Sequence, residues 1–397
     1  MNKTDVKTEH SMASVCLTII VKNESQVIER MLNSVAPLLD AWVVVDTGST
    51  DGTQEIVKAF FDKTGLPGRL VEHKWKNFGD ARNRAIDEAE ALVNELGLQN
   101  PVGFWIDADE QLVPDKGFDA NIFKRKLANF DAANVIVKYG SQVYHRMEFY
   151  RLGIGWRFEG PIHEVLINDR QDLRAATIEG FHVLVKPDGN SWTSQTIKEK
   201  YAGHAEILED YVENDPKKDP RWVFYLAQSY RDCENNKKSI ECYEKRAGMP
   251  GGYWEEVYYS RLMVASLKAK ENEPISDILD AYRKCGMTNP YRAEHLIPII
   301  LYYQSIKDYD TAYIYSSHAM KFAGKSPSPK SVLFVDLPLY LWKIYDLHTI
   351  SCWYSNRKDE SAQTYKKLWK QVERGLVTGQ DLERIKDNKK FFLNLKK

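Results

Sequence analysis

The sequence predicts two domains of different fold class: an α/β domain with a Rossmann-like, mostly parallel sheet, followed by an all-α domain. A length of 397 residues is typical of two domains. Up to residue 190, short apolar runs alternate with amphipathic stretches, which is typical of a parallel sheet covered by helices. After residue 194 the strand signals fade and apolar residues recur at helical spacing. We therefore predict domains at 14–190 and 195–397.

The first predicted strand, 15–21, is a continuous apolar run rich in β-branched residues, as expected for a buried parallel strand. The elements that follow alternate between helix and strand. This order predicts helices on both faces of one sheet. The predicted elements are helices at 25–35, 53–61 and 79–96, strands at 42–45, 69–72 and 102–106, then a helix at 118–129 and strands at 133–137 and 147–151.

The second domain is predicted to consist of short helices joined by tight turns, such as Pro250-Gly251-Gly252. The predicted helices lie at 221–232, 238–246, 254–269 and 275–283. Residues 222–245 have the spacing of a tetratricopeptide (TPR) unit, so we expect TPR-like helical hairpins. A plain helical bundle is the alternative interpretation, and both interpretations give an all-α domain.

The composition is that of an ordinary globular protein in a reducing compartment. The five cysteines are odd in number and form no C-x-x-C pair, which argues against a disulfide framework. Apolar runs are shorter than the roughly 20 residues that span a bilayer, and residues 1–12 contain no apolar signal core. We therefore expect no transmembrane segment and a cytoplasmic location, in a bacterial or phage-infected cell.

Charge is distributed unevenly along the chain. Residues 321–397 contain 16 Lys and Arg but 8 Asp and Glu, although the whole chain has a formal charge of −1. Such a basic segment could meet an anionic partner, but solvated helix faces are the favoured explanation.

Polar side chains follow several of the predicted parallel strands. Asn23 and Glu24 follow the first strand, Asp46 ends the second, and Asp107 and Asp109 end the fourth. Ligands of such sheets bind beyond the carboxyl ends of the strands, so these residues are predicted to converge at one edge.

The Asp107-Ala108-Asp109 step can place two carboxylates near one ion. Carboxylate oxygens are the ligands that Mg²⁺ and Mn²⁺ prefer, so we predict a divalent cation site here rather than a simple capped turn. The chain lacks G-x-x-x-x-G-K-[ST], and it lacks G-x-G-x-x-G after its first strand. These absences argue against a P-loop NTPase and a dinucleotide oxidoreductase.

These motifs together resemble the family 2 glycosyltransferases of the GT-A fold. The matching segments are Val21–Glu24, Val45–Thr53, Phe78–Asn83, Trp105–Glu110 and Phe158–Glu164, in family order and at family spacing. With its helical domain, the chain further resembles the bacterial branch of sublancin-type peptide S-glycosyltransferases. The resemblance implies an inverting transfer from a nucleotide-sugar donor, expected to be a UDP-sugar, assisted by Mn²⁺ or Mg²⁺.

The resemblance also implies roles for individual residues. Asp46 would contact the nucleobase or ribose, with Asn23 and Glu24 shaping that pocket, and Arg82 and Asp107 would complete the donor site. Asp109 would be the principal metal ligand, assisted by Asp107, with His163 or His182 as a further ligand. Glu164 is our first candidate for the catalytic base, and Asp80 and Glu159 are the alternatives.

The acceptor is less constrained. The helical domain is expected to bind it, and concave helical repeats favour a peptide or protein, with a glycan as an alternative. A modified base in nucleic acid, as in phage-type DNA modification, is another alternative because aromatic residues interleave with the basic ones near the C-terminus. Alternatives of other classes are a TPR-like adaptor with a degenerate transferase domain and a nucleotidyltransferase. A homodimer is also among the expected assemblies.

Overall fold

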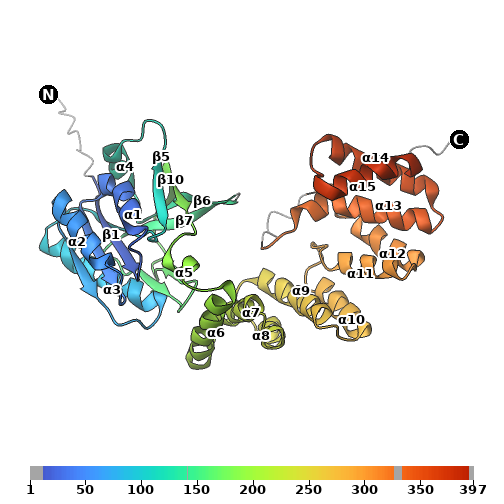
Figure 1. Cartoon of the computed structure of the whole chain (residues 1–397), viewed down its shortest axis with the longest axis horizontal. Helices are drawn as coiled ribbons and strands as arrows, with labels where there is room; N and C mark the ends of the chain where they lie inside the picture. Colours follow the sequence, from blue (N-terminus) through green and yellow to red (C-terminus); the bar gives the residue numbers. More distant parts are fainter. Residues whose placement is uncertain (1–11, 141, 326–332, 393–397) are drawn as a thin grey trace, which may run out of the picture. The chain divides into compact units, whose positions relative to one another are not determined.

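The computed structural model describes residues 12–140, 142–325 and 333–392, and Figure 1 shows its elements. The chain divides into two compact units, the first ending at Tyr211 and the second beginning at Val212. Helix α6 (Ile197–Asn214) contains this division. The domain limits 14–190 and 195–397 stay predictions.

The first unit is built on an eight-stranded sheet with the order β3-β2-β1-β4-β7-β6-β10-β5. Strands β3, β2, β1 and β4 are mutually parallel, whereas β7 is antiparallel to both of its neighbours. The mostly parallel sheet predicted from the sequence is thereby confirmed. Its strands are β1 (Ser14–Val21), β2 (Ala41–Asp46), β3 (Gly68–Glu72), β4 (Pro101–Phe104), β5 (Glu110–Pro114), β6 (Ala132–Tyr139), β7 (Gln142–Arg151) and β10 (Ala175–Val185). A separate hairpin pairs β8 (Arg157–Glu159) with β9 (Val165–Ile167).

Helices cover both faces of this sheet, as the alternating pattern predicts. Leu17 and Ile19 of β1 pack in one buried cluster with α1, α2 and α4, whereas Cys16 packs in a second cluster with α3. Successive side chains of a strand point to opposite faces, so a continuous apolar run is what a strand between two helical layers requires. The helices of this unit are α1 (Ile28–Val35), α2 (Thr53–Thr64), α3 (Phe78–Glu95), α4 (Ala120–Leu127) and α5 (Asn190–Thr193), with a 3₁₀ turn at Ala36–Leu38.

Several predicted strand limits are wrong. Strand β4 ends at Phe104, two residues earlier than expected, and β5 begins at Glu110, where no strand was predicted. The long strand β10 was also missed, because Glu179, Gly180 and His182 interrupt its apolar run and its pairing with β6 shifts register between Thr177 and His182. A local irregularity of this kind weakens the alternating pattern on which strand prediction depends.

The second unit is all-helical, as predicted. Helix α7 begins at Pro220 and α9 at Trp254, a spacing of 34 residues that equals the TPR period. Phe224, Ala227, Tyr243 and Val264 form one buried cluster that joins α7, α8 and α9. The helices are α7 (Pro220–Asp232), α8 (Asn236–Gly248), α9 (Trp254–Lys270), α10 (Ile275–Gly286), α11 (Leu296–Ser305), α12 (Tyr309–Ala319), α13 (Ile344–Tyr354), α14 (Lys358–Glu373) and α15 (Gly379–Phe392), with a π-helical turn at Leu339–Lys343.

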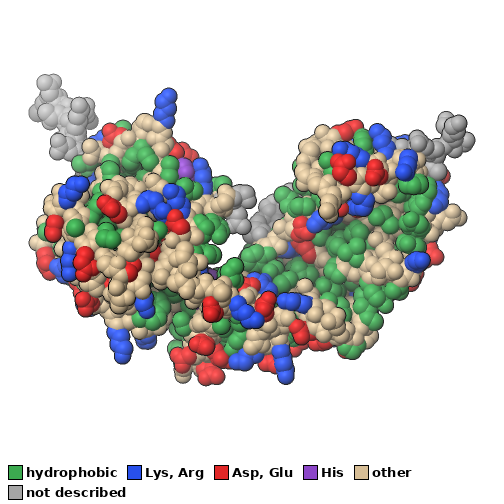
Figure 2. Space-filling model, in the orientation of Figure 1, with side chains coloured by type: hydrophobic (Ala, Val, Ile, Leu, Met, Phe, Trp, Pro, Cys, Tyr) green, Lys and Arg blue, Asp and Glu red, His purple; other side chains and the backbone are tan. Residues whose placement is uncertain are grey.

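The described helices include none with the length and apolar character needed to cross a membrane. All five cysteines are free thiols. Figure 2 shows charges of both signs interspersed over the surface and hydrophobic side chains gathered on the helical unit in this view. The exposed aromatic side chains of that unit include Tyr253, Trp254, Tyr291 and Phe334.

Candidate functional site

The carboxyl ends of β1 and β2 are tied together by hydrogen bonds between the loops that follow them. The Oδ1 atom of Asn23 accepts from the backbone N–H of Thr50 at 2.8 Å, and the Asn23 N–H donates to Oγ of Ser49 at 2.9 Å. Asn23 has a φ of 57°, a conformation that Asn adopts more readily than most residues. The predicted convergence of these loops is present in the structure.

Asp46 ends β2 and is almost fully buried, with 1% of its surface exposed. Its Oδ1 atom accepts from the N–H groups of Gly48 and Ser49, both at 2.9 Å, and from Gln54 at 3.1 Å. Its Oδ2 atom is buried and has no partner among the described residues. An unsatisfied buried carboxylate oxygen is costly, so it marks a position where a ligand could donate a hydrogen bond.

The D-x-D step lies in the turn between β4 and β5. Asp107 accepts from Nη2 of Arg82 at 2.7 Å, and its N–H donates to Oε2 of Glu110 at 3.0 Å. Burial opposes the ionisation of Asp107, but the positive charges of Arg82 and Arg146 outweigh it and hold the pKa of Asp107 below its ordinary value. Asp107 is therefore a carboxylate at neutral pH.

Asp109 differs sharply from Asp107. Burial and the nearby charges of Asp107, Glu110 and Glu24 raise the pKa of Asp109 to about 7. In the described parts of the chain, no other residue forms a hydrogen bond or ion pair with the Asp109 carboxylate. Negative charge is thus concentrated around the Asp109 carboxylate, whose oxygens are available as ligands. A divalent cation bound here would neutralise that charge.

Gly189 lies directly against this carboxylate. A Cβ atom on Gly189 would lie 2.9 Å from Cβ of Asp109 and 3.0 Å from Oε2 of Glu24. The next residue, Asn190, donates its N–H to the same Glu24 oxygen at 3.1 Å. Burial raises the pKa of Glu24 above its ordinary value. The segment after β10 therefore covers the D-x-D step closely, and the sequence prediction missed it.

Arg82 links the D-x-D step to the segment that contains Glu164. Its Nε atom donates to Oε1 of Glu164 at 2.6 Å, and 6% of its side chain is exposed. The guanidinium lies 4.5 Å from the centroid of the Trp105 ring, a cation–π contact. Its Nη1 atom is buried without a partner among the described residues, so a buried donor is left for an anionic ligand.

The position of Glu164 follows from the way its segment packs on α3. A Cβ atom on Gly79 would lie 2.3 Å from the carbonyl oxygen of Gly160, so only glycine permits this approach. The Asn83 side chain donates to the carbonyl of Phe158 at 2.9 Å and accepts from its N–H at 2.8 Å. Gly79 and Asn83 therefore hold the segment 158–164 against α3. Arg82 of the same helix contacts Glu164.

A buried ion cluster supports the D-x-D step from within the sheet. Arg146 of β7 forms a bidentate pair with Glu110, at 2.9 and 2.6 Å, and donates to Glu148 at 2.6 Å. Burial raises the pKa of Glu148 to about 8, although Arg146 opposes this. Two charged residues at i and i+2 share one face of a strand, and this spacing is the sequence signal that could have revealed the pair.

The remaining predicted residues lie in different surroundings. Asp80 forms a 2.7 Å contact with Nε2 of His73 in the first turn of α3. Glu159 ends β8 and pairs with Val165. His163 is exposed, with a φ of 55°, and its ring centroid lies 6.3 Å from that of His204.

His182 lies within β10 rather than among the carboxylates. It is in register with Val113 and Ile136, and Lys138 and Asp115 are its charged neighbours. Val185 of the same strand pairs with Glu110, next to the D-x-D step. His182 lies three residues before Val185, which is about 10 Å along the strand. Its side chain is therefore not brought to the D-x-D step.

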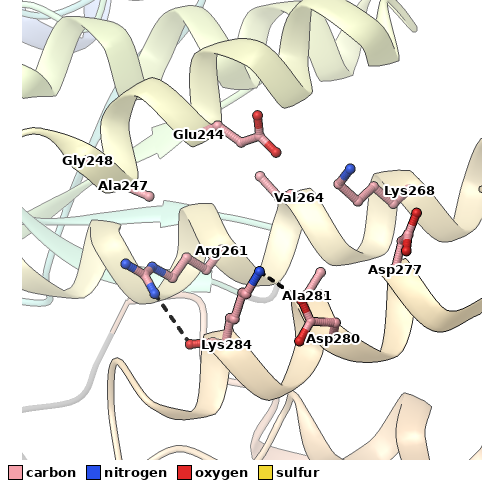
Figure 3. A pocket seen from close by; sticks show the side chains of 10 residues that line it. All are labelled: Glu244, Ala247, Gly248, Arg261, Val264, Lys268, Asp277, Asp280, Ala281 and Lys284. Atoms are coloured by element: carbon pink, nitrogen blue, oxygen red, sulfur yellow. Dashed lines mark hydrogen bonds and ion pairs between the residues drawn. The ribbon is translucent and has the colours of Figure 1, made fainter.

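The helical unit contains a cavity of about 560 Å³ between α8, α9 and α10. Figure 3 shows its lining, in which Lys284 pairs with Asp280 at 2.7 Å and Arg261 donates to the carbonyl of Lys284 at 3.5 Å. Glu244, Lys268 and Asp277 add further charges around an apolar base formed by Ala247, Val264 and Ala281. None of the predicted donor-site residues lines this cavity.

Several known proteins are similar to this chain. The model of glycosyl transferase family 2 matches residues 16–176. The SPbeta prophage-derived glycosyltransferase SunS of Bacillus subtilis (strain 168) is 27% identical over 294 residues, which cover 70% of this chain and 66% of SunS. The chain thus spans just under two thirds of the length of that relative.

Two further proteins are similar to this chain. A TPR repeat-containing protein of Synechococcus elongatus is 29% identical over 163 residues, covering 39% of this chain and 36% of that protein. The crystal structure of S. aureus TarS covers 70% of this chain and 55% of its own, with 16% identity and a TM-score of 0.36. The family match at 16–176 coincides with the sheet that carries Asp46, Asp107 and Asp109. Residues 16–176 are thus similar to glycosyl transferase family 2, and a TPR-like helical unit follows them in this chain.

Proposed function

We propose that this chain is an inverting, metal-dependent glycosyltransferase that takes a sugar from a nucleotide-sugar donor, with a UDP-sugar as the expected donor. The observation that carries the proposal is the Asp109 carboxylate, whose pKa is raised to about 7 by burial and by three neighbouring carboxylates. Such a group is costly to ionise without a cation, and a metal ion together with a diphosphate would compensate its charge.

The nucleotide would be held by buried groups that lack protein partners. Oδ2 of Asp46 can accept from a base N–H or a ribose hydroxyl, and Nη1 of Arg82 can donate to a diphosphate oxygen. Asn23 fixes the loop beside Asp46, and Glu24 lies beside Asp109. These groups support the donor roles that the sequence predicts for them.

The residues present fit a hard divalent cation, Mn²⁺ or Mg²⁺. Asp109 would be the principal ligand, with Asp107 beside it and His163 as the remaining candidate. When bound, the ion would stabilise the negative charge that grows on the diphosphate as the sugar bond breaks. We no longer include His182, because its place on β10 separates it from the carboxylates.

The acceptor proton requires a base, for which Glu164 is our first candidate. Glu164 is 11% exposed, and its Oε1 atom is engaged by Arg82. Its second oxygen can accept a proton while the ion pair holds the side chain in place. Asp80 is the alternative, since it lies two residues before Arg82 on α3 and contacts His73.

We assign acceptor binding to the helical unit, with a peptide or protein, or a glycan, as the acceptor. The cavity between α8, α9 and α10 combines an apolar base with charges of both signs, which suits peptide side chains. A nucleic-acid acceptor is supported less well. Tyr365 and Trp342, two of the aromatics near the C-terminus, are buried in a hydrophobic cluster and are not available for stacking on bases.

An activity assay tests the proposal. Wild type and Asp109→Ala are incubated with a panel of nucleotide sugars and Mn²⁺, and released nucleoside diphosphate is measured. Asp62→Ala, which removes an exposed carboxylate of α2, is the matched control. We expect metal-dependent release by wild type and the control, and its loss in Asp109→Ala. Release that is unchanged in Asp109→Ala would refute the metal role, and no release with any donor would favour the adaptor interpretation.

A further inference from the structure

A second group of potential metal ligands lies in the helical unit and plays no part in the proposed transfer. His348 and Cys352 occupy positions i and i+4 of α13, so both face the same side of the helix, and Glu360 lies on α14. Nε2 of His348 lies 3.4 Å from Sγ of Cys352 and 3.1 Å from Oε1 of Glu360. The ligand atoms of all three residues lie within 4.8 Å of one another. Figure 1 shows these two helices near the C-terminal end of the chain.

Ser316 contacts the other ring nitrogen of His348. The Ser316 hydroxyl donates to the carbonyl of Tyr313 at 3.1 Å, and its oxygen lies 2.9 Å from Nδ1 of His348. When the hydroxyl donates to Tyr313, Ser316 accepts from Nδ1–H of His348, because a hydroxyl has a single proton. In a neutral imidazole, Nε2 then presents its lone pair towards Cys352 and Glu360.

In this tautomer, the lone pair of Nε2 faces the carboxylate oxygen of Glu360 across 3.1 Å. This contact is repulsive unless a cation lies between the two atoms. The cation can be a proton that charges the imidazole, or it can be a metal ion. Burial of His348, which is 2% exposed, disfavours the first arrangement.

The two contacts of Nε2 have lengths near the ligand separations of a metal site. With tetrahedral Zn²⁺ at its usual bond lengths, a nitrogen and a sulfur ligand lie about 3.5 Å apart, and a nitrogen and an oxygen ligand about 3.4 Å apart. The two contacts of Nε2 are close to these values. We propose that His348, Cys352 and Glu360 bind a divalent transition-metal ion, with Zn²⁺ preferred and a water molecule in the fourth position.

Charge and secondary contacts support this assignment. A thiolate and a carboxylate together neutralise a divalent ion, so the buried site would carry no net charge. Glu360 is 43% exposed, which provides access for the ion and the water. Ser316 orients His348, and the hydroxyl of Tyr313 donates to Oε2 of Glu360 at 3.0 Å, so two of the ligands have the outer partners typical of metal sites.

The ion would connect α13 to α14 and, through Ser316, to α12. Its ligand set differs from that of the donor site, because thiolate and imidazole favour Zn²⁺ or Co²⁺, whereas carboxylates alone favour Mg²⁺ and Mn²⁺. The two sites can therefore be distinguished by the metal and by its spectrum.

Cobalt substitution in the full-length protein tests the proposal. Protein stripped with a chelator is titrated with Co²⁺ while the thiolate-to-cobalt charge-transfer band in the near ultraviolet is recorded. We expect the band to saturate with a single equivalent and to be absent from Cys352→Ser. Cys285→Ser is the matched control, because Cys285 is also buried in the helical unit but contacts the carbonyl of Tyr258. A carboxylate donor site cannot produce this band.

Two more variants keep the test informative if Cys352→Ser folds poorly. Glu360→Gln changes a partly exposed side chain, and Ser316→Ala removes an outer partner of His348. We expect Ser316→Ala to weaken Co²⁺ binding about 10–100-fold and Glu360→Gln to weaken it at least as much. The proposal is overturned if wild type shows no thiolate band, if the band survives in Cys352→Ser, or if Glu360→Gln binds Co²⁺ as tightly as wild type does.

Discussion

Gly189 lies against Asp109 so closely that a Cβ atom in its place would stand 2.9 Å from Cβ of Asp109. We predict that Gly189→Ala displaces the Asp109 carboxylate or the segment that covers it. Metal-dependent release of nucleoside diphosphate should then fall at least about 100-fold, as a shift of about 1 Å in an active site can cause.

Gly203 provides the matched control for this substitution. It lies within α6, and no atom would come within 4 Å of an added Cβ. Gly203→Ala should therefore leave activity unchanged and raise stability by about 0.5–1 kcal/mol. Equal activity of the two variants would show that the close approach of Gly189 is not required.

The buried cluster around Arg146 yields a prediction about stability. Arg146→Met leaves Glu110 and Glu148, both buried, without their cation, and should cost about 3–5 kcal/mol. Glu148→Gln keeps the bidentate pair of Arg146 with Glu110 and should cost less than about 1.5 kcal/mol. Urea unfolding of the two variants measures the difference, and a similar cost for both would show that Arg146 does not hold the cluster together.

The raised pKa of Asp109 predicts how the stability of the metal-free protein depends on pH. The folded protein retains the Asp109 proton up to about pH 7, whereas the unfolded chain loses it near the ordinary value of 3.8. Stability contributed by this proton is present at low pH and is lost as pH rises through 7. In the presence of a chelator, wild type should lose more stability between about pH 5 and 8 than Asp109→Asn does. Parallel curves would contradict the raised pKa.

The role of Glu164 as a base can be separated from its role as the partner of Arg82. Glutamine in its place still accepts the Arg82 hydrogen bond, so donor binding should stay near the wild-type value. Turnover should fall about 100-fold or more. Asp80→Asn should cause the smaller loss. If the larger loss of turnover belongs to Asp80→Asn instead, Asp80 is the base.

Much of the fold follows from local patterns in the sequence. The continuous apolar run at 15–21 becomes β1 between two helical layers, and the amphipathic runs become helices on both faces. The helical second unit follows in the same way from helical spacing. Strands β5 and β10 could not be predicted, because β5 is short and β10 is interrupted by Gly180 and charged residues.

The part of the candidate site that lies at the ends of the parallel strands could be predicted from the sequence. Asp46, Asp107 and Asp109 follow β2 and β4, and topology alone brings them to one edge. Gly189 and Arg146 come from elements distant in the sequence, and only the folded chain shows that they contact this edge. His182 shows the opposite case. The family resemblance implies a place near the metal, but strand register places His182 about 10 Å before Val185.

Calorimetric titration of the protein with UDP, in the presence of Mn²⁺ or of a chelator, tests the central claim most directly. We predict that wild type binds UDP in the presence of Mn²⁺, that the chelator weakens binding at least about 10-fold, and that Asp109→Asn binds weakly under both conditions. Other nucleoside diphosphates are titrated in parallel to cover a donor with another base. The claim of a metal-held donor site at the Asp107-Ala108-Asp109 step would be contradicted if the nucleoside diphosphates bind as tightly with chelator as with Mn²⁺, and as tightly to Asp109→Asn as to wild type.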